Sequence, residues 1–295
     1  MLCGVILAGG LSERFGCDKY LWNVNDKPII SIVAFALREI SDRIYLLTRD
    51  KTRAAQLSEI TGVENYILDD VNINCGGPLR GLLTALLKVD SEEYLIIPGD
   101  LPWIDGLSLK RFVERCRESR AECGSIVWGD GSLSSTIQYF NSDARQYLSE
   151  IAKLRGIYGR ATDTFRSCRR VLLTHVSNIT DEPKKLVGVN FQKDIISPQI
   201  PPIYGFINND IYIKRSSLNF LTAVKLESMG DLENALKMYV SEVEEYLDLN
   251  IYHLALHALI DAKRCSSMEE KEIDQQIIEC VSRLGWNKVK RHIPK

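Results

Sequence analysis

Residues 4–19 decide the fold, and they read GVILAGGLSERFGCDK. A short apolar run ends in the pair Gly9-Gly10, and the loop that follows carries Arg14 and Lys19. In an open α/β sheet, the first strand-to-helix loop lies beyond the carboxyl end of its strand and is the usual phosphate site. The glycines let backbone N–H groups approach an anion, while Arg14 and Lys19 supply positive charge. The stretch therefore predicts a buried strand followed by a polyphosphate-binding loop.

Strands and helices alternate from this loop to about residue 110. Apolar runs predict strands at 2–8, 43–49, 63–69 and 93–100, and helical periodicity predicts helices at 30–40 and 78–89. Further strands (123–128, 135–140, 171–176) and helices (108–119, 143–154) are expected downstream. This alternation indicates βαβ crossovers and a mostly parallel, doubly wound, Rossmann-like three-layer sheet with helices on both faces.

The composition changes after residue 197. Three prolines at 198, 201 and 202 predict a Pro-rich linker over 198–215, which ends a sheet domain over 1–197. Residues 216–295 are expected to form an all-helical domain, because helical periodicity with interleaved charges runs to residue 291 without a proline. The spacing of Ala223, Ala235 and Tyr239 around Gly230 resembles one tetratricopeptide-type unit, with a generic helical bundle as the alternative.

Composition and charge exclude several classes of protein. The 295-residue chain has a net charge of -2, so it lacks the basic surface typical of nucleic-acid binding. No apolar run is long enough for a signal segment or a membrane span, which predicts a cytoplasmic protein without membrane contact. The eight cysteines form no C-x-x-C pair, and we interpret them as buried reduced thiols.

The loop at residues 7–19 fits the pattern L-A-G-G-x-S-x-R-[FM]-G-x-D-K. It matches neither G-x-G-x-x-G nor the Walker A pattern. It resembles the opening motif of the MobA-like nucleotidyltransferases, whose type member is the molybdenum cofactor guanylyltransferase. The resemblance implies catalytic roles for Arg14, Lys19 and Asp100. It also implies nucleotide contacts by Leu7, Ala8, Gly9, Gly10, Ser12, Lys19, Asp70 and Gly77.

Asp100 is the predicted metal ligand. It ends the segment IPGD, and residues 97–103 resemble the family's GD-x-P segment, whose aspartate binds magnesium. A carboxylate at the carboxyl end of a strand suits a hard cation beside a triphosphate, so the expected cofactor is Mg²⁺. The alternative for Asp100 is a helix cap or turn residue before Pro102.

Two further segments resemble the family in the expected order. Asp69-Asp70 followed by GPLRG at 77–81 resembles its D…GPLxG nucleotide-recognition loop, in which Asp70 would accept from the base or ribose. Residues 189–194 resemble its closing segment N-V-N-T-P-E-D. There, Gly188 replaces the first asparagine and residues 191–193 replace T-P-E.

The resemblance covers about residues 1–196 and implies a Mg-dependent transfer of GMP from GTP to a phosphorylated acceptor. The acceptor it implies is molybdopterin or its metal-loaded form, with release of pyrophosphate. LAGG together with GPLxG favours GTP over CTP. The alternatives are a related enzyme acting on a sugar phosphate or phospholactate, and a degenerate nucleotide-binding module whose helical tail docks a partner.

The helical segment lies outside this resemblance. We expect it to be an appendage for self-association or partner docking, separate from the catalytic centre, or a layer that packs on the sheet domain and stabilises it. Under the first reading, a chain that ends near Ile196 stays soluble and retains GTP binding.

Overall fold

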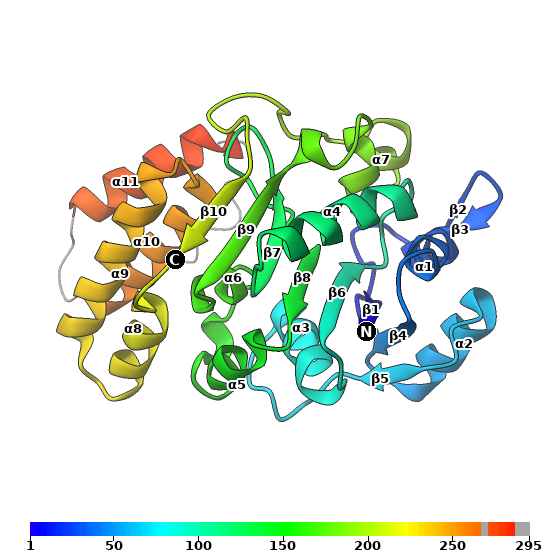
Figure 1. Ribbon diagram of the computed structural model, residues 1–295, viewed down its shortest axis with the longest axis horizontal. Helices are drawn as coiled ribbons and strands as arrows, with labels where there is room; N and C mark the ends of the chain where they lie inside the picture. Colours follow the sequence, from blue (N-terminus) through cyan, green and yellow to red (C-terminus); the bar gives the residue numbers. More distant parts are fainter. Residues whose placement is uncertain (267–270, 287–295) are drawn as a thin grey trace.

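The computed structural model describes residues 1–266 and 271–286 of the chain. Its main sheet, in the order β10-β9-β7-β8-β6-β1-β4-β5, runs through the centre of Figure 1. The strands are β1 (Leu2–Leu7), β4 (Arg43–Thr48), β5 (Tyr66–Leu68), β6 (Glu93–Pro98), β7 (Cys123–Val127), β8 (Gln138–Asn141), β9 (Arg170–His175) and β10 (Ile211–Lys214). β8 and β10 run antiparallel to their neighbours, and the other pairings are parallel. The predicted mostly parallel α/β sheet is confirmed.

Helices cover both faces of the sheet. One face carries α1 (Ile29–Arg38), α2 (Lys51–Thr61) and α4 (Gly106–Glu118), and the other carries α3 (Gly77–Lys88), α5 (Ala144–Leu154) and α6 (Asp163–Ser167). The remaining short elements are the hairpin β2 (Asn23–Val24) and β3 (Lys27–Pro28), α7 (Lys193–Ile196), and 3-10 turns at Lys19–Leu21, Gly156–Tyr158, Val176–Asn178 and Pro183–Leu186.

β1 is apolar throughout because both of its faces are buried. Cys3 and Val5 pack into the core beneath α3, whereas Leu2 and Ile6 pack into the core beneath α1. Successive side chains of a strand point to opposite faces, so a strand covered on both sides buries every residue. The apolar run before Gly9 is therefore the centre of a three-layer domain.

α2 is not among the predicted elements. It begins where the Asp50 carboxylate accepts the Arg53 N–H at 2.8 Å, and it ends at Gly62, whose φ is +66°. It buries only Ala54, Leu57 and Thr61, so its apolar periodicity is weak.

β10 lies within the segment predicted as a linker. Ile211–Lys214 pairs antiparallel with β9 and forms one edge of the sheet. The prolines at 198, 201 and 202 precede this strand and do not interrupt its ladder. The segment therefore carries part of the sheet, and the domain division at 198–215 stays a prediction.

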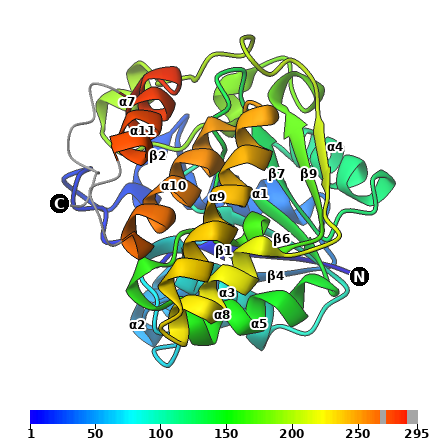
Figure 2. The same ribbon diagram turned by 90° about the vertical axis from the view of Figure 1, so that its left-hand side faces the viewer.

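The C-terminal helices lie beside the β9–β10 edge of the sheet, as Figure 2 shows from that side. They are α8 (Asn219–Ser228), α9 (Leu232–Asp248), α10 (Tyr252–Cys265) and α11 (Lys271–Arg283). α8 and α9 form the predicted helix–turn–helix, in which Gly230 adopts a φ of +82° and Asp231 caps α9. A tetratricopeptide-type repeat stays a prediction.

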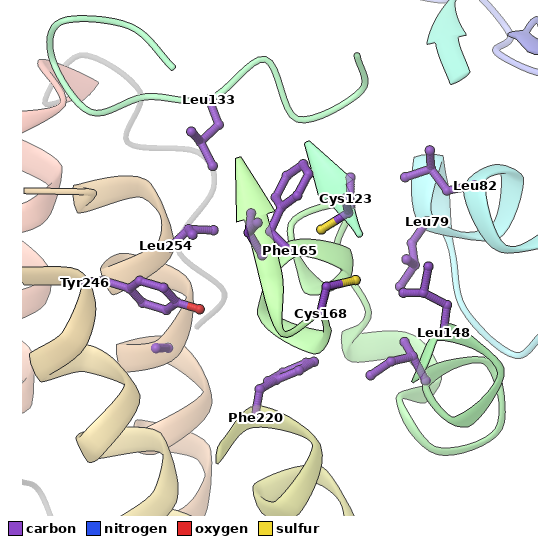
Figure 3. Close-up of a cluster of buried hydrophobic side chains, with 14 of the residues drawn as sticks. Leu79, Leu82, Cys123, Leu133, Leu148, Phe165, Cys168, Phe220, Tyr246 and Leu254 are labelled. Atoms are coloured by element: carbon purple, nitrogen blue, oxygen red, sulfur yellow. The ribbon is translucent and has the colours of Figure 1, made fainter. Parts of the chain in front are cut away.

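These helices share one hydrophobic core with the sheet domain. In Figure 3, Phe220 of α8, Tyr246 of α9 and Leu254 of α10 lie near Phe165 of α6, and the same cluster extends to Leu79 of α3. Burial of this apolar surface favours a packed arrangement over a free appendage. The helices therefore form a layer on the sheet domain, as the second reading of the sequence expects.

A buried ionic network crosses the same boundary. Arg166 of α6 donates two hydrogen bonds to Glu242 of α9, at 2.8 and 2.6 Å, and one to Asp261 of α10, at 2.7 Å. Arg155 joins Asp163 and Asp261 at 2.8 and 2.6 Å. Burial alone would raise the pKa of Asp261, but these arginines hold it well below its usual range. The network fixes α9 and α10 on the sheet domain.

Candidate active site

A pocket of about 730 Å³ opens at the carboxyl ends of the parallel strands. Leu7 of β1, Leu47 of β4 and Pro98 of β6 line its floor, with Asp69 after β5 and Trp128 after β7. This edge is where open α/β sheets bind their ligands, and the volume suits a small-molecule site. We call it the strand-end pocket.

The glycine loop forms one wall of the strand-end pocket. Gly9 and Gly10 both line it, and the Gly10 N–H donates to the Tyr20 hydroxyl at 3.3 Å. A Cβ at Gly10 would lie 2.9 Å from that hydroxyl oxygen, so the approach requires glycine. Tyr20 also lines the pocket, and burial raises the pKa of its hydroxyl. Sequence reasoning did not identify Tyr20.

Ser12 and Ala8 support this loop from outside the pocket lining. Ser12 adopts a φ of +56°, and its hydroxyl accepts the Lys19 N–H at 3.3 Å. Ala8 is buried and donates its N–H to the Leu47 carbonyl at 2.8 Å. These two predicted nucleotide contacts hold the loop that carries Lys19.

Lys19 and Asp100, two of the three predicted catalytic residues, meet in the pocket as an ion pair. Their side chains are 12% and 16% exposed, and Lys19 Nζ also donates to the Val189 carbonyl at 3.4 Å. Arg14 lies on an exposed part of the loop and does not line the pocket. The phosphate role of Arg14 therefore stays a prediction.

Asp69, and not its neighbour Asp70, faces the strand-end pocket. A Cβ at Gly9 would lie 3.3 Å from Asp69 Oδ2, and Asp69 Oδ1 is buried without a hydrogen-bond partner among the described residues. Burial raises the pKa of Asp69, an effect that Arg80 and Arg49 oppose.

Asp70 turns away from the pocket. Its carboxylate lies 3.4 Å from Lys88 Nζ and accepts the Asn72 N–H at 3.0 Å. The motif matched both aspartates, and the alternation of side chains along an extended segment explains why only one faces the pocket.

The amino end of α3 supplies another wall. Gly77, the predicted contact, lines the pocket with a φ of +59°, followed by Pro78 in the first turn. The amino end of a helix carries a partial positive charge, which favours oxygen-rich ligands. Arg80 lines the same wall and is held by a 2.7 Å hydrogen bond from Nε to the Cys75 carbonyl.

The closing segment passes over Asp100. The Val189 N–H donates to the Asp100 carbonyl at 3.1 Å, and Asn190 lines the pocket. A Cβ at Gly188 would lie 3.0 Å from Asp100 Oδ1. The glycine that departs from the family pattern therefore lets the closing segment pass close to the carboxylate, where a side chain would crowd Asp100.

Among residues 1–266 and 271–286, no group of three or more histidine, cysteine, aspartate or glutamate side chains could hold a metal ion. Asp100 offers one carboxylate in the strand-end pocket, where a ligand's phosphate oxygens and water could complete an oxygen shell. Mg²⁺ is commonly bound in this way, through one or two carboxylates plus substrate phosphates. The donor set fits a divalent cation that arrives with a nucleotide.

Comparison with known proteins identifies the family to which the chain belongs. The model of the MobA-like NTP transferase domain matches residues 4–175, which contain the glycine loop, Lys19, Asp69 and Asp100. The chain belongs to this family. It is therefore a nucleotidyltransferase, and enzymes of this kind generally use a divalent metal ion.

Two relatives have the same name, probable molybdenum cofactor guanylyltransferase. The one from Thermococcus kodakarensis is 30% identical over 156 residues, which cover 52% of this chain and 73% of the relative. The one from Pyrococcus horikoshii is 26% identical over 195 residues, covering 66% and 97%. Helices α8–α11 lie beyond the residues that the family model matches.

A solved structure supports the fold. Molybdopterin-guanine dinucleotide biosynthesis protein A from Archaeoglobus fulgidus aligns with a TM-score of 0.53 and 18% identity, over 66% of this chain and 95% of that one. Within the described residues of this chain, no helix is long and apolar enough to cross a membrane.

Proposed function

We propose that the protein transfers GMP from GTP to a phosphorylated acceptor, molybdopterin or its metal-loaded form, and releases pyrophosphate. The observation that carries this proposal is the pairing of Lys19 with Asp100 beside the glycine loop, in a pocket of a MobA-like nucleotidyltransferase. The shared name of the two relatives supports GTP and a molybdenum cofactor precursor as substrates.

The reaction needs positioned charge more than acid–base groups. An acceptor phosphate oxygen forms a bond to the α-phosphorus of GTP, the bond from that phosphorus to the bridging oxygen breaks, and pyrophosphate leaves with the oxygen. The attacking phosphate is already an anion, so no protein base must remove a proton. None of the described residues that line the pocket is a histidine, which agrees with such a mechanism.

Lys19 supplies the positive charge for the nucleotide phosphates. Binding of the phosphates separates its ammonium group from Asp100, and the charge then stabilises the developing charge on pyrophosphate. Asp100 would hold Mg²⁺, which when bound screens phosphate charge as a Lewis acid. The N–H groups of the glycine loop and the Tyr20 hydroxyl are further donors on the same wall.

Asp69 supports the choice of guanine. A carboxylate only accepts hydrogen bonds, and guanine presents adjacent N–H donors on its Watson–Crick edge, whereas adenine lacks that pair. The unpartnered Asp69 Oδ1 leaves capacity for such a contact. Asp69 is therefore proposed in place of Asp70 as the residue that reads the base.

Calorimetric titration with GTP, ATP, CTP and UTP in the presence of Mg²⁺ tests the nucleotide. We expect GTP to bind most tightly, and equal affinity for all four would overturn the guanine assignment. Gly188 departs from the family pattern and lies beside Asp100. The acceptor can therefore differ from that of the family, and it needs a test separate from the nucleotide titration. A pyrophosphate-release screen should compare molybdopterin with sugar phosphates and phospholactate.

A further inference from the structure

The strand-end pocket extends beyond the glycine loop into a second half. Its lining there comes from the β7–β8 loop, the closing segment and residues beyond the matched family domain. These lining residues are Trp128, Ser132–Ile137, Leu186–Gly188, Asn190, Gln199, Pro201 and Trp286. Trp286 follows α11, so the helical layer reaches the pocket. This contact contradicts the expectation that the C-terminal helices lie apart from the catalytic centre.

The β7–β8 loop, residues 128–137, is held from behind by the C-terminal layer. The Leu133 N–H donates to His253 Nδ1 of α10 at 3.1 Å. Gly131 has a φ of +80°, and a Cβ there would lie 2.5 Å from the Asn250 carbonyl oxygen. His253 therefore fixes a pocket wall although it does not itself line the pocket.

Residues 202–207 hold the other side of this loop. The Gly129 N–H donates to the Pro202 carbonyl at 2.8 Å, and the Ile207 N–H donates to the Gly129 carbonyl at 3.1 Å. A Cβ at Gly129 would lie 2.5 Å from the Tyr204 carbonyl carbon. The loop is thus clamped between two segments that follow the matched family domain in sequence.

The loop presents hydroxyl groups to the pocket. The Trp128 indole N–H donates to Ser134 Oγ at 3.0 Å, which engages one of them. Ser132 lines the pocket and is 7% exposed, yet its hydroxyl has no hydrogen-bond partner in the described part of the chain. Buried hydroxyls in folded proteins are nearly always partnered, so a turn of the Ser132 side chain toward a ligand in the pocket would satisfy this one.

Trp286 adds an aromatic surface to the same half. Its ring centroid lies 5.0 Å from that of His253, at an interplanar angle of 79°. His253 in turn packs edge-on against His257, with centroids 4.9 Å apart. The indole is therefore supported by the same histidine that holds the β7–β8 loop, and it lines the pocket. Indole faces bind planar ring systems by stacking.

We propose that Trp286 and the β7–β8 loop form the acceptor half of the pocket, with His253 as the positioning residue. The acceptor is then a phosphorylated molecule with a planar ring that stacks on Trp286 and hydrogen-bonds the Ser132 hydroxyl. This inference rests on the proposed nucleotidyl transfer, and it gives the helical layer a role in acceptor specificity.

The test compares Trp286→Ala, Trp286→Phe and the control Met229→Ala in the full-length protein. Met229 is 71% exposed next to α8 and does not line the pocket. We expect Trp286→Ala to raise the Kd and KM for molybdopterin about 10-fold or more, as for loss of a stacked aromatic ring. Trp286→Phe should recover most of the affinity. The Kd for GTP should stay unchanged in all three variants.

A second pair of variants tests His253. Asparagine can place an acceptor oxygen near the position of Nδ1, whereas leucine cannot accept from the Leu133 N–H. We expect His253→Leu to raise the KM for molybdopterin while GTP binding is kept. His253→Asn, which keeps the hydrogen bond to Leu133 but loses the ring contact with Trp286, should raise this KM less. A general loss of structure would instead weaken GTP binding in parallel.

The outcomes separate this inference from the proposed function. If Trp286→Ala binds molybdopterin as tightly as the unchanged protein, the inference is wrong, whether or not transfer occurs. It is equally wrong if Trp286→Ala weakens GTP binding, or if the unchanged protein prefers acceptors without a planar ring. If molybdopterin binding depends on Trp286 but no GMP is transferred to it, the acceptor half stands and the proposed reaction fails.

Discussion

The ammonium group of Lys19 is paired directly with the carboxylate of Asp100 in the strand-end pocket, although the two residues lie 81 positions apart in the chain. The glycine loop supplies the cation, and the end of β6 supplies the anion. Each neutralises the other before a ligand enters. When a ligand binds, its phosphates can pair with Lys19 and a divalent cation can pair with Asp100. Neither side chain is therefore left as an unpaired charge in this partly buried site, with or without the ligand.

Loss of either member of this pair should abolish most turnover. Lys19→Ala removes charge from the phosphates and Asp100→Ala removes the metal carboxylate, so we expect each to lower kcat roughly 100-fold or more. The exposed Lys51 at the start of α2 provides the control, since Lys51→Ala changes the same net charge as Lys19→Ala. Full activity in Asp100→Ala would remove Asp100 from the metal site.

The two neighbouring aspartates form a matched test of base recognition. Asp69→Asn keeps the shape of the side chain but loses an acceptor in the pocket, so we expect the Kd for GTP to rise about 10-fold or more. Asp70→Asn should leave GTP binding unchanged, because its carboxylate lies near Lys88 outside the pocket. Titration of both variants with GTP and ATP decides which aspartate contacts the base. If Asp70→Asn instead weakened GTP binding and Asp69→Asn did not, Asp70 would be the residue that contacts the base.

The buried ionic network should dominate the attachment of the helical layer. Arg166→Met leaves Glu242 and Asp261 without their shared guanidinium, and breaking a buried pair in this way costs about 3–5 kcal/mol of the free energy of unfolding. Lys225→Met breaks an exposed pair with Glu150 and should cost less than about 1 kcal/mol. Urea unfolding measures both variants. A loss below about 1 kcal/mol in Arg166→Met, as expected for an exposed pair, would show that the network adds little to stability.

Removal of the C-terminal layer gives a direct test of the domain division. The sequence predicts that a chain ending near Ile196 stays soluble and binds GTP. The shared core argues against a soluble truncated chain, because truncation exposes Phe165 and removes β10, the strand that pairs with β9. We expect the truncated chain to aggregate, as measured by sedimentation. A soluble truncated chain with intact GTP binding would support the division at 198–215.

Stability should fall as the solution is acidified from about pH 6.5 to about pH 4. Burial lowers the pKa of His253 to about 4, and burial followed by the charge of His253 lowers the pKa of His257. In this window the unfolded chain binds protons at these histidines and the folded chain does not. For His253 the lost stability is on the order of 3 kcal/mol, at about 1.4 kcal/mol per pKa unit.

Urea unfolding at pH 7 and pH 5 checks this pH dependence. His253→Asn should be less sensitive to pH than the unchanged protein, since asparagine does not titrate. An identical pH dependence in the variant and the unchanged protein would show that His253 is not the source of the lost stability.

Local patterns predicted the elements whose burial follows a simple period. β1, β4 and β6 are apolar because both faces of the sheet are covered, and the glycine loop was located by its position after β1. α2 was missed because it buries few side chains. Short-range pattern also could not distinguish Asp69 from Asp70, because the direction of each side chain depends on where β5 ends.

The remaining features depend on contacts between distant segments. Glu242 and Asp261 belong to the interleaved charges of the helical segment, and the sequence pattern does not show that both are buried. They are buried because Arg155 and Arg166 from the sheet domain reach them. Trp286 carries no motif, and it enters the pocket only because α10 and α11 pack beside the sheet. No local pattern in the sequence predicts these contacts between distant segments.

The most direct test of the central claim is the product of a single reaction mixture. The full-length protein is incubated with molybdopterin, Mg²⁺ and each of GTP, ATP, CTP and UTP, and mass spectrometry and pyrophosphate release are measured together. We predict a molybdopterin carrying GMP and an equal amount of pyrophosphate with GTP, and neither in the Asp100→Ala variant. Tight GTP binding without any such product, or equal products from all four nucleotides, would contradict the proposed guanylyl transfer.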